Sequence, residues 1–199
     1  MTMMKLYNII CASWLIGWIV PASGGTCNWY GSCKQSGTSK PYQACFDLVT
    51  SQGENSGQVC AQVTSNQYLQ LCYNTYGYNF YLSEVQAWAS PQLDGYPSIE
   101  CECTPNAAAF PWNKTNLGAK AKWVCLSATL SSFGAQCCSG GGSHPDQLIY
   151  LLTHAQVYPT GGSGEQIEYS VWSQGHPLTD AGSEYTYSTF NLTCGSTTS

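Results

Sequence analysis

Short stretches of alternating hydrophobic and polar residues run along this chain, a pattern typical of β-strands with one buried face. Residues 58–63 place Val59, Ala61 and Val63 on one face, and residues 68–73 resume the alternation after a short polar turn. Two such runs in succession predict a β-hairpin. Five further stretches are strand candidates, at 78–89, 119–130, 147–158, 166–172 and 185–194.

Two of these stretches, 78–89 and 119–130, also fit a helical stripe. We favour strands because 78–89 is rich in aromatic and β-branched residues and because the preceding runs predict a hairpin. Turn-rich segments rich in Gly, Ser and Pro separate the candidates, at 31–37, 51–57, 91–97, 139–143 and 161–164. The sequence therefore predicts an all-β fold, a disulfide-stapled antiparallel β-sandwich formed by a single domain.

The first residues have the character of a secretory signal peptide. Lys5 supplies a positive charge, residues 9–20 form an apolar run of 12, and small residues follow at 21–25. A membrane-spanning helix needs about 20 apolar residues, so we interpret 1–23 as a signal peptide rather than an uncleaved anchor. We expect a secreted, extracellular protein whose mature chain, 24–199, is one disulfide-rich β domain with no membrane span.

Composition narrows the class of partner. The 199 residues include 11 Asp and Glu, 6 Lys and no Arg, and charged residues make up only 9%. A chain without a basic surface is a poor ligand for phosphate backbones, so we expect no nucleic-acid partner. Aromatic residues make up 13%, enough to fill a core, so the low charge does not indicate disorder.

The chain has 12 cysteines, of which Cys11 lies in the predicted signal peptide. In an oxidising compartment we expect most of the others to form disulfides, the candidates being Cys27, Cys33, Cys45, Cys60, Cys72, Cys101, Cys103, Cys125, Cys137, Cys138 and Cys194. Because this number is odd, one cysteine is left over. Cys27 and Cys33 precede the first strand candidate, and either could tether a partner through a disulfide.

Two cysteine clusters raise the question of a metal site. Zinc sites prefer pairs of cysteines separated by two to four residues. Cys101-Glu102-Cys103 and Cys137-Cys138 do not have this spacing, so we expect neither a metal nor a cofactor.

Two acceptor sequences for N-glycosylation lie in the predicted mature chain. They are Asn113-Lys114-Thr115 and Asn191-Leu192-Thr193, and neither has Pro at the middle position. The two sequences therefore predict a glycoprotein with glycans on Asn113 and Asn191.

His154 is the candidate for chemistry, because it lies inside an apolar run. A buried histidine needs hydrogen-bond partners for its ring nitrogens, and Glu84 is the residue that we pair with it. We expect this pair to be a structural lock, with half of an acid–base site as the alternative. Glu100 with Glu102, and Glu165 with Glu168, form acidic pairs that a glycosidase could use, although a solvated edge is the simpler interpretation.

The surplus of aromatic residues is a second candidate feature. Those that do not enter the core would form a platform for sugar or protein contacts. The candidates crowd one region of the sequence and are Tyr76, Tyr78, Trp88, Tyr96 and Trp112.

Four short motifs occur in order between residues 58 and 175. They are Leu82-Ser83-Glu84-Val85, Phe110-Pro111-Trp112, His154-Ala155-Gln156-Val157 and Val171-Trp172-Ser173-Gln174-Gly175. Together they resemble a β-rich domain of secreted and surface proteins, which implies an extracellular binding or matrix module. This chain departs from that domain in its added cysteines and in Thr153, where the domain usually has Ala. Its composition is also similar to that of secreted, Cys-rich algal glycoproteins of the matrix and sexual-pheromone types.

We therefore expect a secreted, non-enzymatic glycoprotein that acts by binding an extracellular protein or glycan. Its role would be that of a pheromone-like intercellular signal or of an extracellular matrix or cell-surface component. The alternatives are a small secreted hydrolase and a sugar-binding lectin.

Overall fold

The computed structural model describes residues 44–64, 68–99, 104–135, 147–161, 167–178 and 182–192. The strands are β1 (Ala44–Thr50), β2 (Asn55–Val63), β3 (Tyr68–Asn74), β4 (Phe80–Ser90), β5 (Ser98–Ile99), β6 (Thr104–Pro105), β7 (Trp112–Lys114), β8 (Trp123–Thr129), β9 (Gln147–Pro159), β10 (Tyr169–Ser173), β11 (His176–Leu178) and β12 (Gly182–Leu192). Two short 3-10 helices, η1 (Ala107–Ala109) and η2 (Leu130–Phe133), complete the described part. The predicted all-β, disulfide-stapled fold is confirmed, and the ambiguous stretches 78–89 and 119–130 contain β4 and β8.

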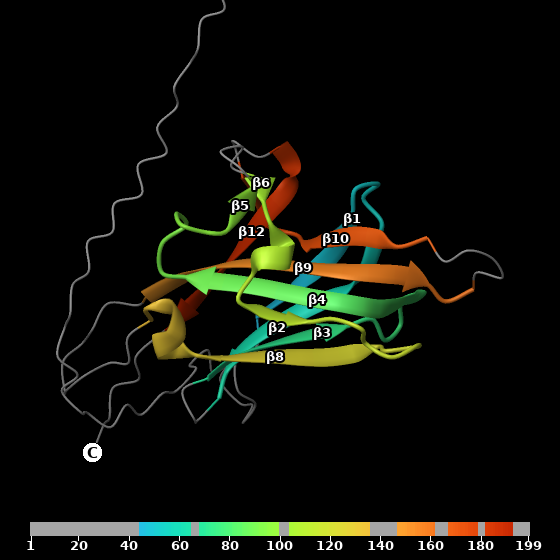
Figure 1. Cartoon of the computed structure of the whole chain (residues 1–199), viewed down its shortest axis with the longest axis horizontal. Helices are drawn as coiled ribbons and strands as arrows, with labels where there is room; N and C mark the ends of the chain where they lie inside the picture. The colour runs from blue at the N-terminus through green and yellow to red at the C-terminus, as the bar shows by residue number, and fades with distance from the viewer. Residues whose placement is uncertain are drawn as a thin grey trace, which may run out of the picture.

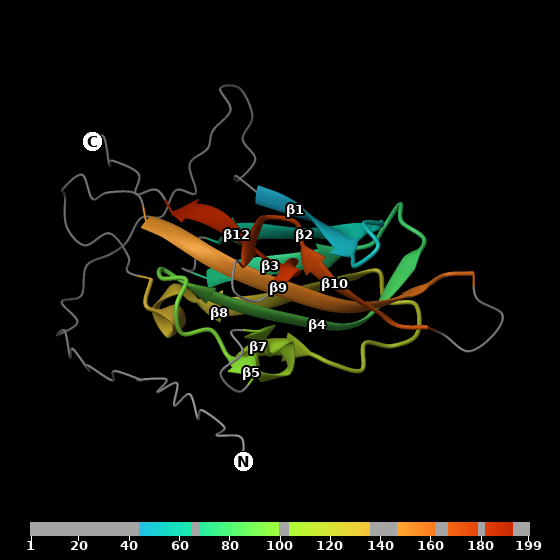
Figure 2. The same cartoon turned by 90° about the horizontal axis from the view of Figure 1, so that it is seen from above.

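All strand pairs are antiparallel, and the main sheet runs in the order β11-β12-β9-β10-β1-β2-β3-β8. The long strand β9 carries β4 on one edge and, on the other, first β12 and then β10. Leu82 of β4 also forms a bridge with Ala121, just before β8. The sheet therefore curls back on itself and nearly closes, with β4 and β9 in one layer and β1, β2 and β3 in the other (Figures 1 and 2).

A β-bulge decides which side chains of β4 face the interior. Leu82 and Val85 are both fully buried in the main core although they are three positions apart. The pairing with β9 shifts between Leu82 and Glu84, so Ser83 is the extra residue. Beyond the bulge, Glu84 and Gln86 alternate with the interior residues and lie on the opposite face of the sheet.

The apolar residues form two clusters, one on each face of β4 and β9. The first fills the interior of the sandwich and includes Leu48, Leu71, Tyr73, Leu82, Leu151 and Val157. The second lies on the outer face and consists of Trp88, Phe110, Leu152, Trp172 and Leu178. Residues on both sides of the gap at 100–103, among them Leu93, Tyr96 and Ala107, pack against this second cluster, and Phe110 meets the ring of Trp172. Each large side chain buried in this way contributes about 1.5–3 kcal/mol.

Four cysteines form one row across four neighbouring strands. Cys45 of β1 is bonded to Cys60 of β2, and Cys72 of β3 to Cys125 of β8. Within the sheet each bonded pair is directly opposed, and Cys60 is also directly opposite Cys72. These disulfides are compatible with an oxidising, extracellular compartment.

The other seven predicted disulfide candidates lie outside the described residues, as does the predicted signal peptide. They are Cys27, Cys33, Cys101, Cys103, Cys137, Cys138 and Cys194. An odd, unpaired cysteine thus stays a prediction. Within the described ranges, no helix has the length and apolar character needed to cross a membrane.

The chain passes very close to itself where β10 leads into β11. A side chain at Gly175 would place its Cβ 2.1 Å from the backbone oxygen of Tyr187 in β12. Only glycine fits such an approach without displacing backbone, which gives a physical reason for the glycine that ends the Trp172 motif.

Candidate functional site

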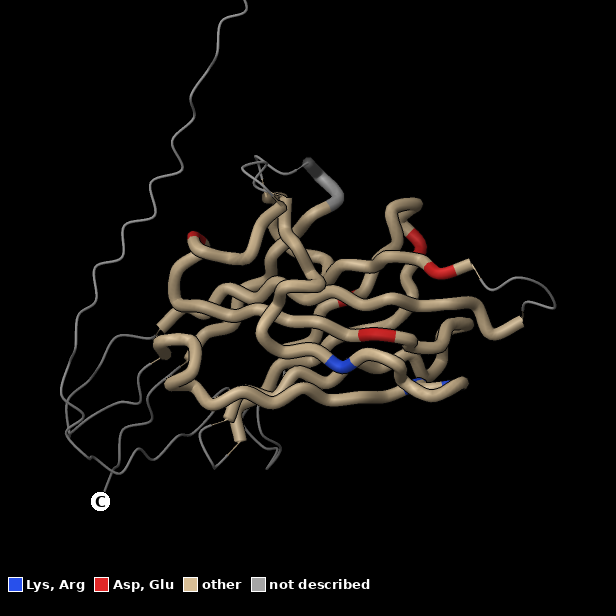
Figure 3. Tube along the Cα trace, in the orientation of Figure 1, with Lys and Arg blue, Asp and Glu red and all other residues tan. Residues whose placement is uncertain are grey.

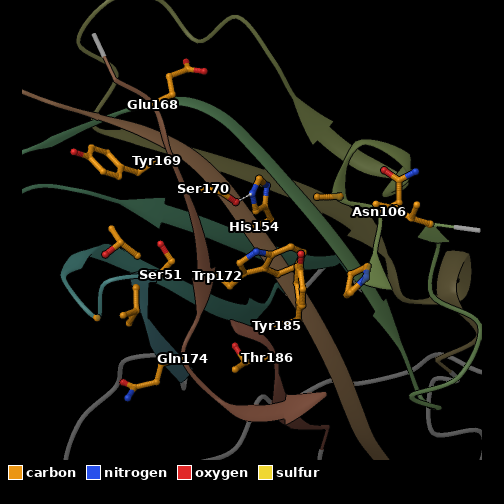
Figure 4. A pocket seen from close by; sticks show the side chains of 16 residues that line it. Ser51, Asn106, His154, Glu168, Tyr169, Ser170, Trp172, Gln174, Tyr185 and Thr186 are labelled. Carbon is orange, nitrogen blue, oxygen red and sulfur yellow. Dashed lines mark hydrogen bonds between the residues drawn. The ribbon is translucent and has the colours of Figure 1, made fainter. Parts of the chain in front are cut away.

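A groove of about 790 Å³ lies beside β10, on the outer face of the sheet (Figure 4). His154 of β9 and Ser170 and Trp172 of β10 line it from the sheet. Its other walls come from the turn after β1, from Asn106 at the start of η1, and from Tyr185 of β12. Segments far apart in the sequence therefore converge on one concave surface, which is the usual form of a ligand site.

A chain of four polar side chains runs from this groove along the sheet. Ser170 Oγ lies 2.7 Å from His154 Nε2, and His154 Nδ1 lies 2.7 Å from Gln86 Oε1. Gln86 Nε2 donates to Glu84 Oε2 over 2.8 Å. The carboxylate of Glu84 thus turns the amide oxygen of Gln86 toward the histidine. His154 Nδ1 must then carry the proton and donate, which leaves Nε2 to accept from the hydroxyl of Ser170.

The surroundings of His154 favour this neutral form. Its side chain is 5% exposed, and its ring centroid lies 4.8 Å from that of Trp172. Burial disfavours the charged imidazolium and lowers the pKa of His154 to about 4. At neutral pH the imidazole is therefore uncharged and can accept a proton at Nε2.

The structure joins the predicted pair of Glu84 and His154 through a third residue. Both ring nitrogens of His154 are already engaged, by Gln86 and by Ser170, so Glu84 acts on the histidine only through Gln86. The sequence offered a signal for Gln86, which shares a strand face with Glu84. It offered none for Ser170, because the residue directly opposite His154 on β10 is Trp172, and Ser170 is its diagonal neighbour.

The five aromatic residues predicted to bind a ligand lie outside this groove. Tyr76 is 65% exposed, whereas Trp88 is only 8% exposed. Tyr78, Tyr96 and Trp112 are half-buried and pack against the two apolar clusters. Trp88 and Trp112 line a smaller hollow of about 320 Å³ together with Asp94 and Phe133.

Of the acidic candidates only one is described by the structure, whereas both glycosylation candidates are. Glu168 lines the groove, whereas Glu100, Glu102 and Glu165 lie outside the described residues. The side chains of Asn113 on β7 and Asn191 on β12 are exposed, and Asn113 Nδ2 donates to the backbone oxygen of Phe110 over 3.2 Å.

A metal centre has no candidate in the described part of the chain. Among those residues, no three His, Cys, Asp or Glu side chains gather as a set that could hold a metal ion. Charged residues are sparse and scattered there (Figure 3). The polar groups that line the groove are hydroxyls, amides, the imidazole of His154 and the carboxylate of Glu168, and aromatic rings lie beside them.

Comparison of the chain with protein-family models, with curated proteins and with solved structures gives no match.

Proposed function

We propose that the protein is a secreted glycoprotein that acts by binding a neutral, hydroxyl-rich ligand of the glycan class in the groove beside His154. The observation that carries the proposal is the lining of the groove. Hydroxyl and amide groups come from Ser51, Asn106 and Gln174, and aromatic rings come from Trp172 and Tyr185. Rings that stack on apolar faces, next to groups that hydrogen-bond, suit a sugar ring.

The electrostatics of the groove support a neutral ligand. Among the residues that the structure describes, its lining contains a single carboxylate, from Glu168, and no lysine. Lys114 and Lys122 are engaged elsewhere, with the backbone oxygens of Cys125 and Tyr78. A phosphate or sulfate ester would therefore find no lysine among the described lining residues to offset its charge, whereas an uncharged glycan needs none.

The rings are held firmly enough to serve as a platform. Tyr185 packs edge-on against Trp172, with ring centroids 5.4 Å apart, and Phe110 supports Trp172 from another side at 6.2 Å. A rigid aromatic surface loses little conformational entropy on binding. Less of the favourable contact energy is therefore offset, and the affinity is higher.

The test uses the mature protein, 24–199, secreted from eukaryotic cells and applied to a glycan array, with titration calorimetry on the best ligand. We expect Tyr185→Ala and Asn106→Ala each to weaken binding at least tenfold. Tyr76→Ala removes an exposed ring outside the groove and should bind like the parent. Binding that survives both groove substitutions, or no binding to any glycan, would contradict the proposal.

The place where the protein accumulates distinguishes a diffusible signal from a matrix component. A pheromone-like signal should appear in the culture medium, and a matrix or surface component should stay with the cell fraction until extracted. The exposure of Asn113 and Asn191 supports N-glycosylation. Treatment with a peptide N-glycosidase should then lower the mass of the secreted protein, and Asn113→Gln and Asn191→Gln should each remove one glycan.

A further inference from the structure

We infer that Ser170 is a nucleophile for acyl esters, with His154 as its general base, so that the groove removes acyl groups from the ligand that it binds. The nature of the substrate, an O-acylated glycan, rests on the proposed function. The serine chemistry rests on the geometry of Ser170, His154, Gln86 and Glu84 alone. This activity goes beyond the proposed binding of a glycan.

The geometry is that of an activated nucleophile. Ser170 Oγ and His154 Nε2 are 2.7 Å apart, within reach for proton transfer. Gln86 holds the other ring nitrogen at 2.7 Å, and Glu84 fixes the amide of Gln86. A nucleophile beside a base that a third group orients is the common arrangement of covalent acyl-transfer sites.

Exposure is divided between the two residues as catalysis requires. Ser170 is exposed on the groove wall, so a substrate can approach Oγ. His154 is 5% exposed beneath it, so bulk water does not compete for Nε2. The lowered pKa of His154 keeps the ring uncharged at neutral pH, and the same burial makes Nε2 a weaker base than a solvated imidazole. Figure 4 shows the serine and histidine side chains pointing toward each other.

The reaction that follows has two balanced halves. Ser170 Oγ attacks the ester carbonyl carbon while its proton passes to His154 Nε2, and the bond to the alcohol oxygen breaks as that oxygen takes the proton. Water then attacks the acyl-serine, gives a proton to Nε2, and Ser170 Oγ recovers it. The sum is ester plus water giving acid plus alcohol, with no oxidation or reduction.

The decisive experiment treats the mature protein with a fluorophosphonate probe and locates the adduct by intact mass and peptide mapping. We expect one adduct, on Ser170, and hydrolysis of 4-nitrophenyl acetate that Ser170→Ala abolishes. His154→Gln should slow labelling at least 100-fold, the lower range for loss of a general base. Ser98→Ala changes another exposed strand serine and should label and hydrolyse like the parent.

The outcomes separate this inference from the proposed function. Ser170 is exposed, so Ser170→Ala should fold normally, which circular dichroism verifies. A folded parent that takes no adduct, or takes it on another serine, would overturn the inference. If that parent still binds glycans on the array, binding stands and only the acyl chemistry fails. Labelling of Ser170 without any glycan binding would instead refute the proposed ligand class.

Discussion

The hydroxyl of Tyr73 donates a hydrogen bond to the backbone oxygen of Gln86 over 2.7 Å, across the interior of the sandwich. Tyr73 lies on β3 and is fully buried, and burial raises the pKa of its hydroxyl well above the ordinary value. This hydrogen bond connects β3 in one layer to β4 in the other. β4 also carries the side-chain amide of Gln86, which lies between Glu84 and His154. Gln86 therefore belongs to the core through its backbone and to the hydrogen-bonded chain of His154 through its side chain.

Replacing Tyr73 with Phe should lower the free energy of unfolding by about 1–3 kcal/mol. The substitution keeps the ring and removes only the hydroxyl, which leaves the oxygen of Gln86 without this donor in a buried place. Urea denaturation followed by circular dichroism measures the change. Tyr76→Phe is the matched control, because Tyr76 is 65% exposed. Equal losses in the two variants would show that the interior bond contributes nothing specific.

The stability of the protein should fall as the solution is acidified toward pH 4. The pKa of His154 is lowered to about 4 in the folded state, against about 6.5 in an unfolded chain. Between these values the unfolded chain binds a proton that the folded protein does not, so acid favours unfolding. The loss from this one group, between pH 7 and pH 4, is about 3 kcal/mol.

The control for this pH effect is His154→Gln, which removes the titrating group. Glu84 of the hydrogen-bond chain and Glu168 of the groove are present in both proteins. The difference between the two stability profiles therefore reports on His154. Urea unfolding at pH 7.0, 5.5 and 4.5 should show a steeper decline for the parent, and parallel profiles would contradict the assignment.

Removal of either described disulfide should destabilise the protein, and removal of the longer-range one should do so more. Cys45 and Cys60 are 15 residues apart, and Cys72 and Cys125 are 53 apart. In the chain-entropy description these loops correspond to about 3 and about 4 kcal/mol. The two double Cys→Ala variants, unfolded in urea without reductant, test the order. A larger loss from the Cys45–Cys60 pair would reverse the prediction.

Gly175→Ala should be strongly destabilising although it adds one methyl group. The new Cβ would lie 2.1 Å from the backbone oxygen of Tyr187, so strands β10 to β12 would have to separate at a cost of about 1–3 kcal/mol or more. Gly118→Ala is the control, since a Cβ there meets nothing within 4 Å. Thermal melting of both variants decides. A Gly175→Ala protein that melts with the control would show that the strands shift apart easily.

The sequence predicts those strands that bury only one of their two faces, because such strands alternate between hydrophobic and polar residues. The hairpin predicted at 58–73 corresponds to β2 and β3. Its hydrophobic and polar residues alternate in the sequence because they alternate between the core and the outer face of the sheet. β1 was not predicted, since only Leu48 and Thr50 are buried in it and its pattern is faint. The two-residue strands β5 and β6 are too short to carry any period.

The candidate site was predictable only in part, for a different reason. His154 stood out as a polar residue in an apolar run, but its partners depend on the register between strands and on the bulge at Ser83. Trp88 gave the signal of a binding aromatic yet is buried, because the segment with Leu93 and Tyr96 packs over its face of the sheet. Tertiary placement of that segment has no signature in the local pattern.

The row of four cysteines sets a pairing problem for the newly made chain. Cys60 and Cys72 are the two closest in sequence, 12 residues apart across the β2–β3 hairpin, so loop closure favours their bond first. That bond fits the native strand register. It leaves Cys45 and Cys125 unpaired, because they lie at opposite ends of the row. The thiolate of Cys45 can then attack Cys60 and release Cys72, which leaves one native disulfide. The second bond, between Cys72 and Cys125, forms in a separate two-electron oxidation. Maturation of this fold thus calls for thiol–disulfide exchange, which the oxidative folding machinery of a secretory compartment supplies.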